Sequence, residues 1–286
     1  MADTTCDSLC KLFFGAPFVT ASVALSKQFL KKLIAFFESR CLPIHDALFE
    51  ELASLMVVEQ NDGRDFNTYF VGKKSITVLS NRSILMNGTT GLHSWQAGKM
   101  FSLFALQNQH LFASKSVVEL GSGTGLTGLV ILHMCNPRNY LFTDHNPLVI
   151  DLIRQNLTIN GFNDKNLVAA LNWFDDRSTI LDVLVANNPD VLIGCDLIFD
   201  IDLIPAFCQT LSTILNENQK CKAFIMSTLR NTHTILSFES QLLRKNLSFS
   251  KQEFKAENDS CFFINPNCHF ILHEITVHLK SVKLLQ

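Results

Sequence analysis

The sequence lacks an excess of charge of either sign. Its 286 residues include 24 lysines and arginines against 26 aspartates and glutamates, a formal net charge of −2. Nothing in that balance attracts the chain to a polyanion, so we exclude a duplex-binding module and expect neither nucleic acid nor a membrane as a partner. Charged residues make up only 17% and apolar residues 47%, which excludes a disordered chain. The length suits one large catalytic domain with an extension, or two small domains.

Paired cysteines are also missing. The nine cysteines form no C-x-x-C motif and lie scattered through apolar runs: Cys6, Cys10, Cys41, Cys135, Cys195, Cys208, Cys221, Cys261 and Cys268. This pattern suggests neither a zinc site nor a disulfide framework, and the histidines form no ligand-spaced cluster, so we predict no metal. Reduced, mostly buried thiols indicate a cytoplasmic protein.

Long hydrophobic runs are absent as well. No stretch approaches the roughly 20 apolar residues that a membrane span needs. The one candidate leader, residues 12–26, is interrupted by Pro17 and preceded by acidic as well as basic residues. We interpret it as a core-forming helix rather than a signal peptide and expect a soluble protein.

We expect residues 1–86 to form a helical and β-hairpin extension. Apolar residues recur at helical spacing over 18–60, where Pro43 should separate two helices. Two β-branched runs within 69–79 flank a Gly-Lys-Lys turn, which predicts a hairpin. This extension would precede the main domain, residues 87–286.

Residues 87–286 alternate between short apolar runs and helical stretches. The predicted strands are Lys115–Leu120, Tyr140–Asp144, Leu167–Leu171, Asp190–Cys195, Ala223–Thr228, Leu247–Phe254 and Phe270–Val277. Strands this apolar, alternating with helices, indicate an α/β fold with a parallel sheet covered on both faces. The last two strands follow each other without a helix, so we expect an antiparallel hairpin at one edge.

A glycine-rich turn follows the first of these strands. The run Glu119-Leu120-Gly121-Ser122-Gly123-Thr124-Gly125 leads into a helix, and glycines allow a ligand to approach the backbone. A nicotinamide or flavin site has the motif G-x-G-x-x-G, and the third glycine of that motif would fall at position 126, which is leucine in this chain. Glu119 would repel a pyrophosphate but could hold a cation such as the ammonium group of S-adenosylmethionine. A methyl-donor site is therefore the better interpretation, although a glycine turn without a ligand stays open.

The end of the next strand supplies a second acidic group. Asp144 lies about 20 residues beyond the glycines, where an acidic side chain can accept hydrogen bonds from both ribose hydroxyls. A lone aspartate at a strand end can also serve only as a turn or helix cap. The spacing from the glycines favours the ribose role.

Further segments resemble one known family. They are Asn87–Leu92 with Trp95, Glu119–Leu129, Met134–Arg138 leading to Asp144, Asn160-Gly161, Trp173, and Pro189–Phe199. In order and spacing they are similar to the seven-β-strand protein-lysine methyltransferases, and within these to the members that act on translation elongation factor 2. The resemblance implies a Rossmann-like, seven-stranded class I methyltransferase sheet with S-adenosylmethionine as cofactor. It also implies a monomeric enzyme that methylates a protein lysine, with elongation factor 2 as its partner.

The resemblance also assigns the site residues. Those expected to line the cofactor are Trp95, Glu119, Gly121, Ser122, Gly123, Asp144, Trp173 and Cys195. The aromatic face of Trp173 could pack on adenine. Taken alone, the two tryptophans could equally belong to the core, and Cys195 could be a small buried apolar residue.

A second motif concerns the substrate. Asp196-Leu197-Ile198-Phe199 matches the family's D-x-x-Y/F motif. The resemblance implies that Asp196 orients the lysine ammonium and that Phe199 helps to wall its channel, whereas Asp196 could also be a helix cap. The chain departs from the family at Asn172, where aspartate is frequent, and at Thr232, where an R-N-P segment has proline.

Other functions stay open from the sequence. The segment at 187–190 resembles an N-P-P-Y motif but precedes its strand, which disfavours methylation of nucleobases or glutamine. The alternatives are a class I methyltransferase that acts on another protein or a small molecule, and a catalytically silent scaffold. Residues 1–86 could recognise the folded substrate or only cover the sheet edge.

Overall fold

The computed structural model describes residues 23–57, 64–81, 85, 88–185, 187–255 and 261–278. The chain divides into two compact units, Met1–Ile84 and Leu85–Gln286. The boundary predicted from the sequence, between residues 86 and 87, lies two residues further along the chain. Within the described ranges, no helix is long and apolar enough to cross a bilayer.

The described part of the N-terminal unit begins with two helices. They are α2 (Val23–Ser39) and α3 (Asp46–Val57), and Pro43 separates them as the sequence predicted. Their apolar sides form one small buried cluster of Leu30, Ile34, Phe37 and Leu48. The predicted helical residues 12–22 lie outside the described part of the chain.

A hairpin follows these helices among the described residues of that unit. Strands β1 (Arg64–Val71) and β2 (Lys74–Asn81) pair antiparallel over their full length. Val71 lies opposite Lys74, so the Gly72-Lys73 turn closes the hairpin where the Gly-Lys-Lys turn was predicted.

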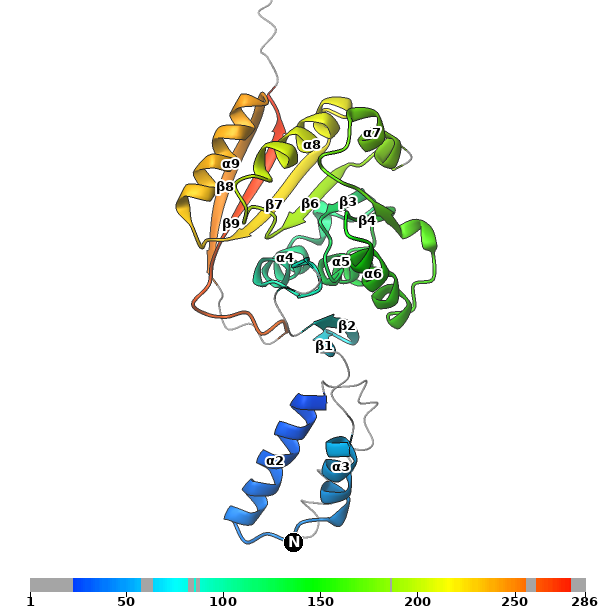
Figure 1. Ribbon diagram of the computed structural model, residues 1–286, viewed down its shortest axis with the longest axis vertical. Helices are drawn as coiled ribbons and strands as arrows, with labels where there is room; N and C mark the ends of the chain where they lie inside the picture. Colours follow the sequence, from blue (N-terminus) through cyan, green and yellow to red (C-terminus); the bar gives the residue numbers. More distant parts are fainter. Residues whose placement is uncertain are drawn as a thin grey trace, which may run out of the picture. The chain divides into compact units, whose positions relative to one another are not determined.

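Seven strands form the sheet of the second unit, in the order β5-β4-β3-β6-β7-β9-β8 (Figure 1). They are β3 (Ser116–Leu120), β4 (Asn139–Asp144), β5 (Val168–Ala170), β6 (Val191–Cys195), β7 (Lys222–Thr228), β8 (Leu247–Lys255) and β9 (His269–Val277). The strands from β3 to β7 run parallel, whereas β9 pairs antiparallel with both β7 and β8. The predicted fold class and the predicted edge hairpin are confirmed.

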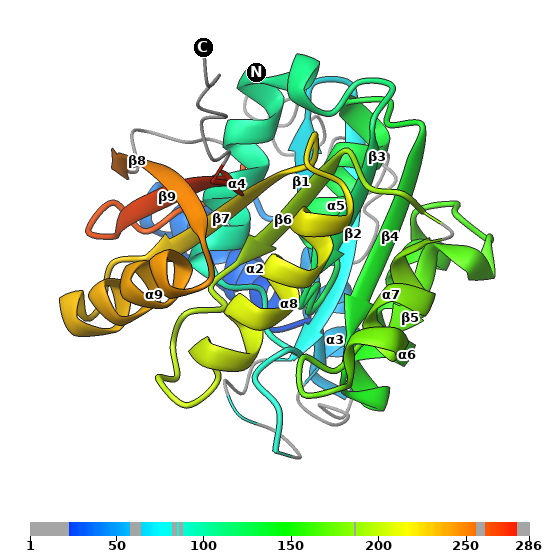
Figure 2. The same ribbon diagram turned by 90° about the horizontal axis from the view of Figure 1, so that it is seen from above.

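Helices cover both faces of this sheet (Figures 1 and 2). One face carries α4 (Gln96–Gln107), α5 (Leu126–Met134) and α6 (Pro147–Ile159), and the other carries α7 (Arg177–Val185), α8 (Ile204–Glu217) and α9 (Thr232–Arg244). Every residue of β3 is buried as a result, which is why the strand appears in the sequence as an apolar run. One core cluster joins the sheet to α8 and α9 and includes Leu120, Leu192, Phe207, Leu211 and Phe238.

The direction of chain progression reverses between β3 and β6. From β3 the chain moves outward through β4 to β5, and from β6 it moves outward through β7 to the opposite edge. Open α/β sheets bind ligands outside the carboxyl ends of their strands at such a switch point. The loops that follow β3, β4, β5 and β6 are therefore where a site is expected.

Candidate active site

A cavity of about 260 Å³ opens among the loops at the carboxyl ends of β3, β4, β5 and β6. Eight of the ten predicted site residues line it: Trp95, Gly121, Gly123, Asp144, Trp173, Cys195, Asp196 and Phe199. The other two, Glu119 and Ser122, border a second cavity of about 40 Å³ whose wall includes Trp95, Gly121, Gly123 and Cys195. The structure thus brings all ten predicted residues to one place.

The glycine loop after β3 has two positions where any residue other than glycine would be strained. Gly121 has φ +60 and Gly123 has φ +55, in the left-handed region that disfavours residues with a Cβ. A Cβ on Gly121 would lie 2.5 Å from Leu197 Cδ2, and one on Gly123 would lie 3.2 Å from the carbonyl oxygen of Gly91. The loop therefore presents bare backbone to the cavity.

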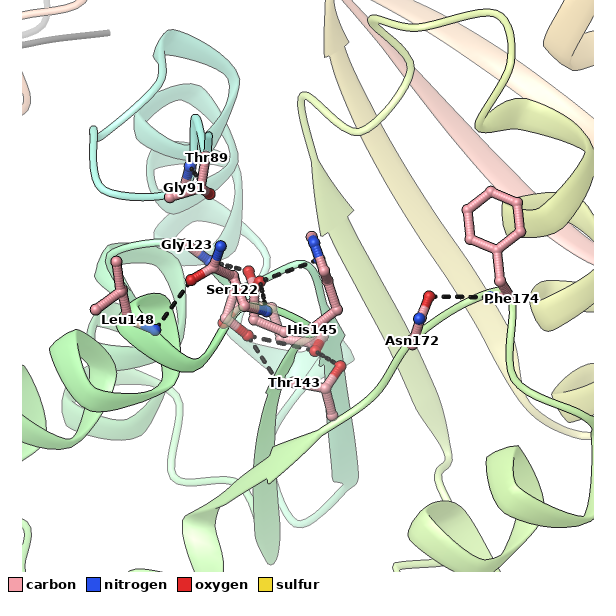
Figure 3. Close-up of polar contacts among 12 residues, drawn as sticks. Thr89, Gly91, Ser122, Gly123, Thr143, His145, Leu148, Asn172 and Phe174 are labelled. Carbon is pink, nitrogen blue, oxygen red and sulfur yellow. Dashed lines mark hydrogen bonds and ion pairs between the residues drawn. The ribbon is translucent and has the colours of Figure 1, made fainter. Parts of the chain in front are cut away.

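Ser122 fixes the glycine loop to the neighbouring strand. Its backbone N–H donates to the carbonyl oxygen of Thr143 at 2.8 Å, and its Oγ accepts a hydrogen bond from Thr143 N at 3.0 Å (Figure 3). These bonds hold the loop in register with the end of β4, where Asp144 follows.

Asp144 serves both the loop and the cavity. Its Oδ2 accepts a hydrogen bond from Gly123 N at 3.3 Å and its Oδ1 accepts one from Asn146 N at 3.1 Å. Burial raises the pKa of Asp144 above its ordinary value, an effect that these backbone donors and the nearby His145 oppose. The predicted turn role is thus present, and the carboxylate also lines the cavity, where its Oδ1 lies 3.6 Å from His145 Nδ1.

The loop after β5 forms the opposite wall. Trp173 lines the cavity and also packs on Phe207, with ring centroids 4.7 Å apart, so it is both a core residue and a cavity residue. Asn172 Oδ1 accepts a hydrogen bond from Phe174 N at 3.1 Å, which closes a local turn (Figure 3). Asn172 and the 66% exposed Phe174 border the cavity as well.

Two buried titratable groups lie behind the glycine loop. Glu119 accepts a hydrogen bond from the Tyr140 hydroxyl at 3.0 Å, and burial raises the pKa of Glu119 to about 8. Burial likewise raises the pKa of Cys195 well above its ordinary value, and its Sγ accepts a long hydrogen bond from Thr127 Oγ1 at 3.9 Å. Near neutral pH the Cys195 thiol is therefore protonated and unreactive.

Asp196 occupies a constrained position at the end of β6. Its φ of +54 is unusual for a residue with a side chain. Its carboxylate accepts hydrogen bonds from Thr228 N at 2.8 Å and from Ala97 N at 3.3 Å. Ala97 lies in the first turn of α4, so Asp196 does cap a helix, but one from a distant part of the sequence. Phe199, at the cavity mouth, is 51% exposed.

Several contributors to the site were not predicted. His145, Phe174 and the segment Thr89–Gly91 line the cavity, and each lies next to a predicted residue or inside a segment that carries the family resemblance. Arg230 does not line the cavity. It lies after β7 and contacts the site by donating a hydrogen bond to the carboxylate of Asp196. The sequence identified Arg230 only as part of a departure from the family pattern.

Together, these features define a class of enzyme. The glycine loop lies at the switch point of a doubly wound sheet, and a buried aspartate at the end of the next strand anchors it. Class I S-adenosylmethionine-dependent methyltransferases have their cofactor site at this position. The residues fit that cofactor, because backbone, carboxylate and indole groups converge on one cavity.

Comparison with known proteins identifies the family. A family model described as lysine methyltransferase matches residues 77–244. The human protein-lysine N-methyltransferase EEF2KMT is 30% identical over 240 residues, which cover 79% of this chain and 72% of that protein. EFM3 of Chaetomium thermophilum, also a protein-lysine N-methyltransferase, is 26% identical over 252 residues, 77% of this chain and 72% of that protein. The chain belongs to the lysine methyltransferase family.

Solved structures agree on the fold. The structure of SMU.776, a putative methyltransferase complexed with S-adenosylhomocysteine, matches with a TM-score of 0.52 at 14% identity and covers 82% of this chain and 67% of that one. The predictions of a class I methyltransferase fold, of S-adenosylmethionine as cofactor and of protein-lysine N-methyltransferase activity are confirmed.

Proposed function

We propose that this chain transfers methyl groups from S-adenosylmethionine to a lysine ε-amine of translation elongation factor 2 in the cytoplasm. The observation that carries this proposal is the similarity to the enzymes named EEF2KMT, which extends over 79% of the chain for the human protein. The bovine and mouse proteins of the same name are 29% and 30% identical. The predicted monomeric state stays a prediction.

In this proposal, each wall of the cavity binds one part of the cofactor. The backbone of Gly121–Gly123 would hold the methionine part, and Glu119, which borders the adjoining cavity of about 40 Å³, would attract its ammonium group. Asp144, held by Gly123 N at 3.3 Å, accepts hydrogen bonds from the ribose, and Trp173 packs on the adenine. When bound, the cofactor supplies an electrophilic methyl group on a positively charged sulfur.

The substrate lysine reaches this methyl group past Asp196 and Phe199. A lysine side chain has a pKa near 10.4 and arrives as ammonium, so it must lose a proton before it can attack. The carboxylate of Asp196 orients the nitrogen, while the half-exposed ring of Phe199 walls the entrance. These roles rest on the family motif and on the position of both residues in the cavity wall.

The remaining alternatives differ in substrate or in activity. A calmodulin-lysine N-methyltransferase of Arabidopsis thaliana is 28% identical, but only over 156 residues, 53% of this chain. That shorter match favours elongation factor 2 over calmodulin as the protein substrate. A silent scaffold is disfavoured by the glycine loop, whose conformation a Cβ at Gly121 or Gly123 would disrupt.

A labelling experiment tests the proposal. The purified chain is incubated with radiolabelled S-adenosylmethionine and a cell lysate, beside a Gly123→Arg variant that should not bind the cofactor. We expect one labelled band at the size of elongation factor 2 that the variant does not produce. Labelling of calmodulin or of a different protein instead would assign another substrate, and a wild-type chain that binds the cofactor but labels nothing would contradict the proposal.

A further inference from the structure

Arg230 contacts two walls of the cavity without lining it. Its Nη2 lies 3.4 Å from Oδ2 of Asp196, and its guanidinium carbon lies 4.9 Å from the ring centroid of Trp95. Trp95 immediately precedes α4, Asp196 follows β6 and Arg230 follows β7. One side chain therefore joins three separate elements at the carboxyl edge of the sheet.

The carboxylate of Asp196 is almost fully engaged. Besides Arg230, its Oδ2 accepts hydrogen bonds from Thr228 Oγ1 at 2.9 Å and from Ala97 N at 3.3 Å. Among the described residues, Oδ1 accepts a single bond, from Thr228 N at 2.8 Å. Each carboxylate oxygen has about two acceptor positions, so Oδ2 is fully used and Oδ1 can accept one further hydrogen bond.

Arg230 also places a positive charge beside the carboxylate of Asp196. The Asp196 side chain is 7% exposed and the Arg230 side chain is 47% exposed, so water reaches the pair mainly from the Arg230 side and screens it only in part. An uncompensated carboxylate at that depth would stabilise the ammonium form of a lysine beside it and raise the pKa of that lysine. The ammonium form has no lone pair and cannot attack the methyl group.

The other titratable groups around this end of the cavity come from several elements. They are His93 beside Trp95, Glu119 and Cys195 behind the glycine loop, Asp144 with His145 after β4, and Asp200 next to Phe199. Within the described residues, Arg230 is the one group with a permanent positive charge in contact with Asp196.

We propose, on the basis of the function proposed above, that Arg230 is a positioning residue that neutralises Asp196. Asp196 then accepts a hydrogen bond from the neutral amine of the substrate lysine and does not hold its ammonium form. The ammonium proton leaves to solvent before attack. The nitrogen lone pair then forms the bond to the methyl carbon, the carbon–sulfur bond breaks with its electron pair returning to sulfur, and a second proton leaves the methylated nitrogen.

A binding experiment tests this without any protein substrate. Butylammonium imitates the charged end of lysine, and its affinity at pH 7 is measured by calorimetry in the presence of S-adenosylhomocysteine. Arg230→Gln should bind butylammonium about tenfold more tightly than wild type, because Asp196 loses its internal cation. The matched control is Arg138→Gln, which breaks the Arg138–Asp190 pair, 3.1 Å long, away from the cavity and should leave the affinity unchanged.

Two results of this experiment would overturn the inference. One is an Arg230→Gln protein that binds butylammonium no more tightly than wild type. The other is a loss of S-adenosylhomocysteine affinity with no change for butylammonium, which would assign Arg230 to the support of Trp95 alone.

A kinetic experiment measures the consequence for transfer. The kcat for methylation of elongation factor 2 is followed from pH 6.5 to 9.5. Wild type and Arg230→Lys should level off at the same pH, whereas Arg230→Gln should level off about one pH unit higher. A uniformly lower kcat with an unchanged midpoint would contradict the inference. A wild-type enzyme that does not methylate elongation factor 2 would contradict the proposed substrate, and the butylammonium result would then decide on Arg230.

Discussion

A change in the protonation of Glu119 on cofactor binding would show whether the ammonium group of the cofactor binds beside this carboxyl. Burial raises the pKa of Glu119 to about 8, so about nine-tenths of the carboxyls are protonated at pH 7. In the proposed complex the ammonium group of the cofactor lies beside this carboxyl, and an adjacent cation favours the ionised form. Cofactor binding should therefore release a proton from Glu119.

Calorimetry in buffers of different ionisation enthalpy measures that release. Glu119→Gln is the matched control, because glutamine keeps an acceptor for the Tyr140 hydroxyl but does not titrate. The difference between wild type and variant cancels the protonation of the cofactor's own amine. It should be most of one proton per cofactor at pH 7 and clearly less at pH 8, where more of the Glu119 carboxyls are already ionised. Equal proton counts for both proteins at both pH values would refute the placement of the ammonium beside Glu119.

The same carboxyl affects stability in the absence of cofactor. The pKa of Glu119 rises on folding from an ordinary 4.5 to about 8, so between these values the folded state binds more protons than the unfolded state. The free energy of unfolding should therefore decrease as the pH rises through this window. Urea unfolding at several pH values between 5 and 8 should show this decrease in wild type and a smaller one in Glu119→Gln. A parallel pH dependence for the two proteins would contradict the raised pKa.

Four variants separate cofactor binding, folding, turnover and substrate recognition. Gly123→Arg should abolish cofactor binding in calorimetry while the protein stays folded, because a long side chain in the cavity wall would obstruct the approach of the cofactor to the backbone; unchanged affinity would remove the loop from the site. Gly128→Ala should instead cost about 1–3 kcal/mol of stability in urea unfolding, since its Cβ would lie 2.1 Å from a buried phenylalanine ring, and wild-type stability would contradict this packing. Asp196→Asn should lower turnover much more than cofactor affinity, and wild-type turnover would leave Asp196 a structural role only. Lys31→Glu with Lys32→Glu, on the exposed side of α2, should weaken methylation of elongation factor 2 if residues 1–86 recognise the substrate; unchanged kinetics would favour a covering role for that region.

The sequence predicted the sheet well because its strands are buried on both faces. The runs that end at Leu120, Asp144 and Cys195 are nearly continuous in apolar residues, and the structure ends β3, β4 and β6 at these residues. The third predicted strand, Leu167–Leu171, is shorter in the structure, at Val168–Ala170. Asp164 caps a short 3₁₀ helix that takes up Leu167, and an apolar pattern does not reveal that local competition.

The contacts within the site were less accessible from the sequence. The resemblance gave residue types and their order, and all ten predicted residues meet around the two cavities. The pairing of Arg230 with Asp196 spans 34 residues and depends on how the ends of β6 and β7 come together. The left-handed backbone of Asp196 is similarly set by tertiary contacts, since Thr228 and Ala97 both donate to its carboxylate.

The central claim is that this chain methylates a lysine of elongation factor 2, and mass spectrometry of purified components tests it most directly. Purified elongation factor 2 is incubated with the chain and S-adenosylmethionine, then analysed intact and after digestion. The account predicts a mass increase of one or more methyl groups confined to a lysine-containing peptide, absent with Gly123→Arg. An unmodified elongation factor 2, in the presence of folded wild-type chain that binds the cofactor, would contradict the claim.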